Sequence, residues 1–273
     1  MSTFLQKSIF FNPPISLIIF LSIVNSICLR AQENGYKWKI IAGVLLSENA
    51  IIDKNFSLVP FSGQIPGAGI SVIYSGKKSL QELKLHFLSG KLNAGNTKNT
   101  SKESYLTIKY SYLFGLTQHN SGFKIFIGPS LNAGFAGRTF SGFLNNNISY
   151  ENFISLSGDF HFGYDFGGAL SGFYLANEFS LPAFSSVEQP SFGSQLSIGE
   201  VKYDSKLRSF ILNRIFLSPA KFLNLKNAIS LGRRFGENNQ MSISYVMEYY
   251  NLKTNRKVIQ SWNGLELSYG YRF

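Results

Sequence analysis

The last ten residues of the chain alternate between apolar and polar side chains. Apolar residues from Leu265 to Phe273 share one face of an extended chain, and Glu266 and Arg272 lie on the other face. Successive side chains of a β-strand point to opposite faces, so this alternation predicts a strand with one apolar and one charged face. Such a strand suits a barrel wall between lipid and a polar lumen.

The same alternation recurs along the chain and predicts ten strands. They lie at residues 36–46, 67–75, 79–92, 103–114, 122–137, 150–166, 168–181, 221–235, 240–250 and 259–273. We therefore predict an all-β fold, a transmembrane antiparallel up-and-down β-barrel of about ten strands. One alternative has twelve strands, with a further hairpin inside residues 191–217. A soluble periplasmic β-sandwich also fits alternation alone.

The predicted connections fall into a long and a short set. The long set comprises residues 47–66, 93–102, 138–149, 182–220 and 251–258, and the short set comprises 76–78, 115–121, 167 and 236–239. Barrels of the outer membrane have long extracellular loops and short periplasmic turns. We therefore expect the loops at 47–66 and 182–220 to be presented to a surface ligand or partner.

The composition favours an apolar outer surface. The 273 residues are 44% hydrophobic, 15% aromatic and 15% charged, whereas soluble domains carry about 25% charged residues. After residue 31, no uncharged apolar run approaches the roughly 20 residues that a membrane-spanning helix needs. Alternating strands must therefore carry the apolar surface, and the 26 Phe and 14 Tyr residues suit the aromatic girdles of a barrel.

The N-terminus has the pattern of a secretory signal peptide. Lys7 precedes an uncharged apolar core at residues 15–24, and Ala31 marks a plausible cleavage site. We predict a signal peptide at 1–31 and an outer-membrane barrel domain at 32–273, with an uncleaved anchor as the alternative. The single cysteine, Cys28, lies in the segment to be removed, and the bulky Ile27 before it argues against lipidation. The mature chain would then have neither disulfides nor thiolate metal sites.

The formal net charge of +11 invites a nucleic-acid partner, but the basic residues are dispersed and form no run with interleaved aromatic residues. We therefore expect no nucleic-acid partner. Positive loops at the outer surface are better explained by contact with the phosphates of outer-membrane lipids.

Charged residues at inward positions predict a network in the lumen. A ten-stranded barrel is only slightly wider than the eight-stranded size that side chains just fill. We therefore expect paired charges that pack the lumen, because an unpaired buried charge is costly. The predicted network comprises Lys37, Lys39, Glu82, Lys84, His86, Lys109, Lys124, Asp165, Lys226, Arg234, Glu248, Glu266 and Arg272.

Three inward residues of one predicted strand suggest a catalytic site. Ser157, Asp159 and His161 occupy successive inward positions, roughly 7 Å apart. Glu178 on the next strand would orient the histidine, as a Ser-His-acid mechanism requires. A lipid- or peptide-hydrolase is therefore the alternative function. The sequence has no metal-ligating motif and no glycine-rich phosphate loop, so we expect no cofactor.

The final strand resembles the closing strand of bacterial outer-membrane β-barrel proteins, in which a terminal Phe after alternating apolar residues is the assembly signal. The resemblance implies that Tyr269, Tyr271 and Phe273 are recognised by the barrel-assembly machinery. The mature chain resembles small uncharacterised barrels of Gram-negative, Bacteroidota-like bacteria. Asp159-x-His161 also resembles half of the omptin protease site, but the chain lacks the Asp-x-Asp that omptins need. These resemblances imply an outer-membrane location and a barrel architecture, and for such a narrow barrel we expect a structural, binding or narrow-pore role.

Overall fold

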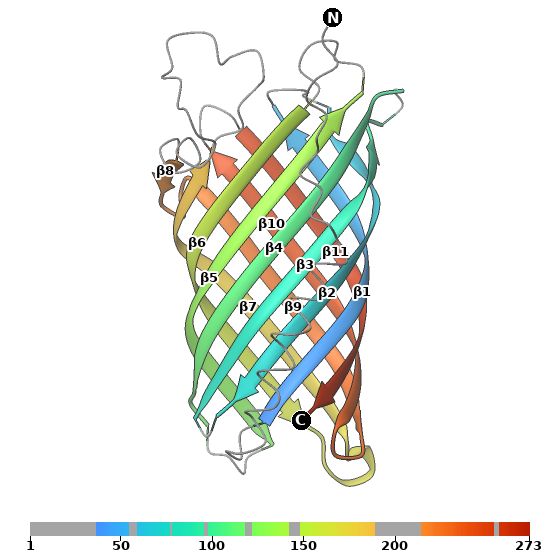
Figure 1. Ribbon diagram of the computed structural model, residues 1–273, viewed down its shortest axis with the longest axis vertical. Helices are drawn as coiled ribbons and strands as arrows, with labels where there is room; N and C mark the ends of the chain where they lie inside the picture. The colour runs from blue at the N-terminus through green and yellow to red at the C-terminus, as the bar shows by residue number, and fades with distance from the viewer. Residues whose placement is uncertain are drawn as a thin grey trace, which may run out of the picture.

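A computed structural model describes residues 37–54, 59–76, 78–95, 98–117, 122–141, 148–188, 214–253 and 257–273. Long antiparallel strands form a closed, tilted barrel (Figure 1). The wall consists of β1 (Lys37–Asp53), β2 (Phe61–Ser75), β3 (Ser79–Asn93), β4 (Thr100–Gly115), β5 (Phe123–Phe140), β6 (Ile148–Asp165), β7 (Phe173–Glu188), β9 (Phe222–Phe235), β10 (Asn239–Lys253) and β11 (Lys257–Arg272). A 3₁₀ turn, η1 (Gly168–Leu170), lies between β6 and β7, and the short strand β8 (Arg214–Leu217) pairs with the end of β7.

Two pairings close the ring. β1 pairs with β11, with Lys39 opposite Arg272, and β7 pairs with both β6 and β9. The predicted fold class is therefore confirmed, with ten wall strands. The twelve-strand alternative is wrong, because β9 lies directly against β7 and leaves no place for a further hairpin in the wall. The closed ring also rules out the β-sandwich.

The two ends of the barrel carry different connections. The C-terminus lies at one end (Figure 1), together with the connections at 76–78, 116–122, 166–172 and 236–238. We call this the turn end. The other end, the loop end, carries the connections at 54–60, 94–99, 141–147, 189–221 and 254–256.

A broad band of apolar side chains covers the outer wall. On β11, Leu265, Leu267 and Tyr269 are 55%, 52% and 50% exposed, and the outward residues of the other long strands are similarly exposed. Proteins in water rarely expose a continuous apolar surface of this extent. The band is therefore the surface that contacts lipid. In the described ranges, no helix is long and apolar enough to cross a membrane.

Toward the loop end the apolar side chains move from the outer face to the lumen. On β6, Phe160 is 37% exposed on the outside, whereas Phe153 points inward and is 2% exposed. Aromatic rings meet across the lumen: Phe153 lies 5.8 Å from Tyr250 between ring centroids, and Phe61 lies 5.3 Å from Phe140. We call this cluster the apolar plug. Its residues include Leu45, Ile51, Phe61, Ile65, Leu88, Leu92, Tyr105, Ala136, Phe140, Phe153, Val187, Phe222, Val246, Tyr250, Leu252, Val258 and Trp262.

This change of polarity corrects the predicted loops. Strands β1 and β2 run through most of the predicted loop 47–66 and leave only 54–60 as a connection. Beyond the lipid band the outer face meets water and the lumen becomes apolar, so the rule that apolar residues face outward no longer marks the strands. The connections at 94–99, 141–147 and 254–256 are shorter than predicted for the same reason. The predicted contrast in length is thus confined to residues 189–221.

The predicted loop 182–220 also begins too early. β7 continues through Pro182 to Glu188, and the register with β6 shifts at Leu156 and Ser157, opposite Pro182. Proline cannot donate a ladder hydrogen bond but is tolerated at a bulge. Residues 189–213, which contain most of this predicted loop, lie outside the described residues.

Candidate functional site

The apolar plug surrounds one buried ion cluster. The side chain of Arg138 on β5 is fully buried; its Nε donates to Glu103 Oε1 at 3.1 Å, and its Nη1 lies 3.5 Å from Glu151 Oε2. Gln260 accepts from Arg138 Nη2 at 2.9 Å and donates to Glu103. Asn49 donates to the other oxygen of Glu103 at 2.6 Å. The cluster therefore ties β1, β4, β5, β6 and β11 together across the lumen.

A cavity of about 170 Å³ lies beside the plug in the middle of the lumen. Trp262 and Val246 belong to both the plug and the cavity lining, and Gln240 and Ser268 extend the lining toward the turn end. The charged lining residues are Lys39, Lys84, Lys109, Lys226, Glu82, Glu178, Glu248 and Glu266. The lumen is therefore apolar toward the loop end and charged in the middle.

Several of the lining charges are paired. Lys109 Nζ lies 2.7 Å from Asp159 Oδ2, and Lys226 Nζ lies 3.5 Å from Glu248 Oε2. Glu248 also accepts a hydrogen bond from the hydroxyl of Tyr105 at 2.7 Å. These contacts fix the sides of the cavity.

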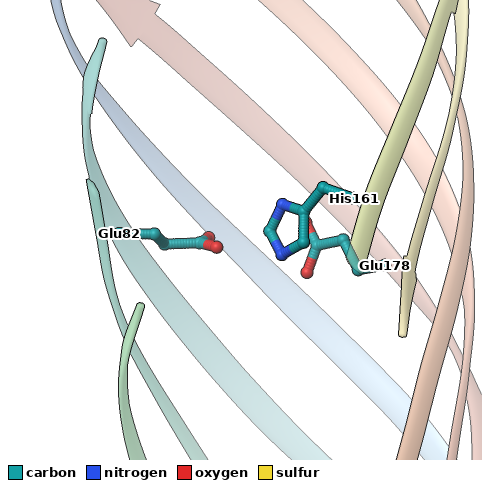
Figure 2. Close-up of side chains that lie close together, drawn as sticks. All are labelled: Glu82, His161 and Glu178. Atoms are coloured by element: carbon teal, nitrogen blue, oxygen red, sulfur yellow. The ribbon is translucent and has the colours of Figure 1, made fainter. Parts of the chain in front are cut away.

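Three side chains from separate strands converge within the lumen. Glu82 from β3 faces His161 from β6 and Glu178 from β7 (Figure 2), and one potential ligand atom of each lies within 4.8 Å of the others. His161 and Glu178 are register partners, which brings them side by side. Lys84 Nζ lies 2.8 Å from Glu178 Oε2 and 3.7 Å from Glu82 Oε1. We call Glu82, His161 and Glu178 the Glu-His-Glu cluster.

Two atoms of this cluster are buried without a hydrogen-bond partner. They are Nε2 of His161, a residue only 9% exposed, and Oε2 of Glu82, a residue only 2% exposed. The other oxygen of Glu82 accepts from the hydroxyl of Ser71 at 2.6 Å. The cluster therefore holds one nitrogen and one oxygen without a partner, and its two glutamates also line the cavity.

The structure does not assemble the predicted hydrolase site of Ser157, Asp159, His161 and Glu178. Asp159 accepts hydrogen bonds from Ser111 at 2.7 Å and Ser130 at 2.8 Å, and it pairs with Lys109. Its carboxylate is thus occupied by groups other than His161.

The predicted nucleophile is also engaged elsewhere. Ser157 Oγ accepts a hydrogen bond from Asn132 Nδ2 at 3.0 Å. Within the described residues, no hydrogen bond joins Ser157 to His161. A serine nucleophile needs its base within hydrogen-bond reach, so this geometry gives a hydrolase no support. Glu178 does lie beside His161, as expected from neighbouring strands, but it pairs with Lys84.

The predicted lumen residues separate into groups. Near the turn end, Asp165 pairs with Lys124 at 2.6 Å and with Arg234 at 2.7 Å. His86 Nε2 lies 3.8 Å from Glu266 Oε2 at the cavity. Of the remaining predicted members, Lys39 lines the cavity opposite Arg272 of β11, and the side chain of Lys37 lies outside the described residues.

The sequence prediction missed the ion cluster inside the plug. Alternation in the predicted strands puts Glu103, Glu151 and Gln260 at inward positions. Their positions in the strands could therefore have indicated that these polar side chains lie in the lumen. Arg138 fell in the predicted loop 138–149, whereas β5 continues to Phe140. Its burial depends on that extension, which the alternation did not indicate.

The closed antiparallel ring, the apolar outer band and the charged lumen define a transmembrane β-barrel of the bacterial outer-membrane class. No protein-family model matches the sequence, and no curated protein sequence matches it. The fold is similar to that of the outer-membrane protease OmpT from Escherichia coli, with a TM-score of 0.51 and 10% identity over 87% of this chain and 96% of OmpT. Likeness at this identity shows the fold alone.

Two other outer-membrane barrels show weaker structural similarity. Neisserial surface protein A has a TM-score of 0.38 and 11% identity, over 88% of this chain and 98% of its own. The attachment invasion locus protein Ail of Yersinia pestis has a TM-score of 0.35 and 10% identity, over 86% and 99%. The fold shared with OmpT and the apolar band support an outer-membrane location. The signal peptide at 1–31 stays a prediction, because residues 1–36 lie outside the described residues.

Proposed function

We propose that the protein is a sealed outer-membrane barrel with a structural or binding role at the cell surface, and that it is not a pore. The apolar plug carries this proposal, because every strand of the wall contributes a buried side chain to it. Phe61, Phe140, Phe153 and Phe222 are each at most 2% exposed. An ion crossing this layer would lose its hydration, and the polar groups inside the layer are already bonded to one another in the Arg138 cluster, so the crossing is strongly unfavourable.

The position of the plug supports a surface role. By the usual orientation of bacterial barrels, the chain termini and short turns face the periplasm and the loop end faces outward. The plug and the Arg138 cluster then lie beneath the outer connections and brace the strand ends that hold them. Rigid strands position a binding surface more accurately than free loops do. The connection between β7 and β9, at 189–221, is the longest in sequence at the loop end.

The seam between the first and last strands supports the predicted assembly signal. Tyr269 and Tyr271 are 50% and 39% exposed on the outer face of β11, and Phe273, directly after the strand, is 45% exposed. The backbone N–H of Phe273 donates to the carbonyl of Trp38 at 2.9 Å, next to the β1–β11 pairing that closes the ring. We infer that the assembly machinery reads these outward aromatic residues before β1 covers the edge of the strand.

Planar-bilayer recording tests the sealed barrel. The purified, folded wild-type protein should give no discrete conductance steps. A variant combining Phe153→Ala, Phe222→Ala and Tyr250→Ala removes the rings that meet across the plug. If this variant keeps the heat-modifiable gel mobility of a folded barrel, it should conduct and show that the assay detects an opened lumen. Regular steps from the wild-type protein would overturn the proposal.

A further inference from the structure

We propose that Glu82, His161 and Glu178 bind a divalent transition-metal ion inside the barrel, with Zn²⁺ as the best-suited ion. The donor set is one imidazole nitrogen and two carboxylate oxygens, supplied by β3, β6 and β7 within 4.8 Å of one another (Figure 2). Zinc takes such ligands at about 2.0–2.2 Å in a tetrahedral arrangement, which sets ligand atoms about 3.4 Å apart. Binding of zinc therefore requires the three ligand atoms to close from within 4.8 Å to about that separation.

The unpartnered atoms of the cluster point to a ligand. His161 Nε2 and Glu82 Oε2 are buried and have no hydrogen-bond partner. Buried polar groups in folded proteins are nearly always satisfied, and each exception calls for an explanation. A metal ion coordinated by both atoms provides one. Neutral imidazole and carboxylate are also ligands that Zn²⁺ accepts, whereas Mg²⁺ and Ca²⁺ favour oxygen ligands alone.

The charge within the Glu-His-Glu cluster favours a cation over an anion. Four lysines and four glutamates line the cavity, so its lining is balanced, whereas the cluster itself brings two carboxylates together. Lys84 is the only cation in ion-pair contact with Glu82 or Glu178 among the described residues. Two carboxylates therefore share one ammonium group. We infer that Lys84 and the metal are alternative occupants of the same position.

The surroundings supply the remaining features of a metal site. The hydroxyl of Ser71 donates to Glu82 Oε1 and thereby holds the unpartnered Oε2 as the free ligand atom. Outer hydrogen bonds of this kind orient metal ligands. The cavity of about 170 Å³ has room for a water molecule as a fourth ligand. Because the plug closes the loop end, the ion would reach the site from the turn end.

The test is metal binding by the full mature chain, folded in detergent micelles and purified without a histidine tag. Isothermal titration should show one Zn²⁺ per chain, and Co²⁺ in its place should give the visible absorption bands of a tetrahedral site. His161→Gln and Glu82→Gln should each weaken Zn²⁺ binding at least 10-fold. His86→Gln is the matched control, because His86 also lines the cavity but contacts Glu266 instead of the cluster. It should bind Zn²⁺ as the wild type does.

A second variant keeps the proposal testable if a ligand substitution prevents folding. Lys84→Met removes the competing ammonium group, so Zn²⁺ affinity should rise and the thermal unfolding temperature should increase with added Zn²⁺ more than in the wild type. Three results would each overturn the site: no stoichiometric Zn²⁺ binding by the wild type, an equal loss in His86→Gln, or weaker binding in Lys84→Met. Equal affinity for Mg²⁺ and Zn²⁺ would contradict a transition-metal site.

Discussion

The loop end and the middle of the lumen differ in how they accommodate ions. In the plug, Arg138 is fully buried and contacts Glu103 and Glu151, with apolar side chains around them. At the cavity, Lys84 keeps 23% of its side chain exposed while it contacts Glu178, which keeps 27%. The wall is continuous through both regions, so the inward residues alone make one region dry and the other polar. The ions of the plug join five strands, whereas Lys84 and Glu178 at the cavity keep part of their surface exposed.

Removing the buried cation of the plug should have the largest effect. Arg138→Met leaves two carboxylates in an apolar region without a cation, which costs about 5 kcal/mol, the upper end for breaking a buried ion pair. Urea unfolding in lipid vesicles, followed by fluorescence, reports the loss. Trp262 is a suitable probe because it lies in the plug. An unchanged urea midpoint would mean that the cluster does not fasten the strands.

Truncating an aromatic residue of the plug should have the next largest effect. Phe153→Ala leaves a cavity where Phe153 contacts Phe222 and Tyr250, at a cost of about 3–4 kcal/mol. Phe160→Ala on the same strand is the control, because Phe160 faces outward and is 37% exposed. It should lower the urea midpoint much less. Equal losses from the two variants would show that the lumen at this end is not a packed core.

The charges near the turn end should contribute least. The side chains of Lys124 and Asp165 are 41% and 29% exposed, and Arg234 also contacts Asp165. Lys124→Met should therefore cost less than about 1 kcal/mol, as exposed ion pairs do. The same urea titration measures it beside Arg138→Met. If Lys124→Met lowered the free energy of unfolding as much as Arg138→Met does, the buried ion pairs of the plug would not differ from the exposed ones near the turn end.

The ten strands and the outward face of the lipid band could be predicted from alternation. Leu83, Leu85 and Phe87 alternate with polar residues, and their faces follow directly from strand periodicity. Where both faces of a strand are apolar, the sequence no longer alternates and does not indicate which face points outward. Phe87 is 50% exposed to the outside and the next residue, Leu88, is 3% exposed in the plug. The plug could not be predicted, because two adjacent apolar residues do not indicate which of them points into the lumen.

Convergence across the lumen could not be predicted from spacing along the chain. Alternation placed Glu82, His161 and Glu178 inward, but their meeting depends on the shear of the barrel and on the pairing of β6 with β7. The bulge opposite Pro182 changes which later residues of β7 face inward. A prediction based on one strand put Ser157, Asp159 and His161 together, whereas the structure assigns each of them different neighbours.

Sided thiol labelling tests the sealed loop end most directly. Ser230 lines the cavity, and Ser47 lies near the plug and is 1% exposed. The variant Ser230→Cys reports access to the cavity, and Ser47→Cys is its buried control. Both variants are placed in residues 32–273, which contain no cysteine, and are reconstituted in vesicles whose barrel orientation is determined by cleavage at a protease site inserted in 189–213. A membrane-impermeant thiol reagent should modify Ser230→Cys only from the turn end and should leave Ser47→Cys unmodified from either side. Rapid modification of Ser230→Cys from the loop end would contradict a sealed barrel.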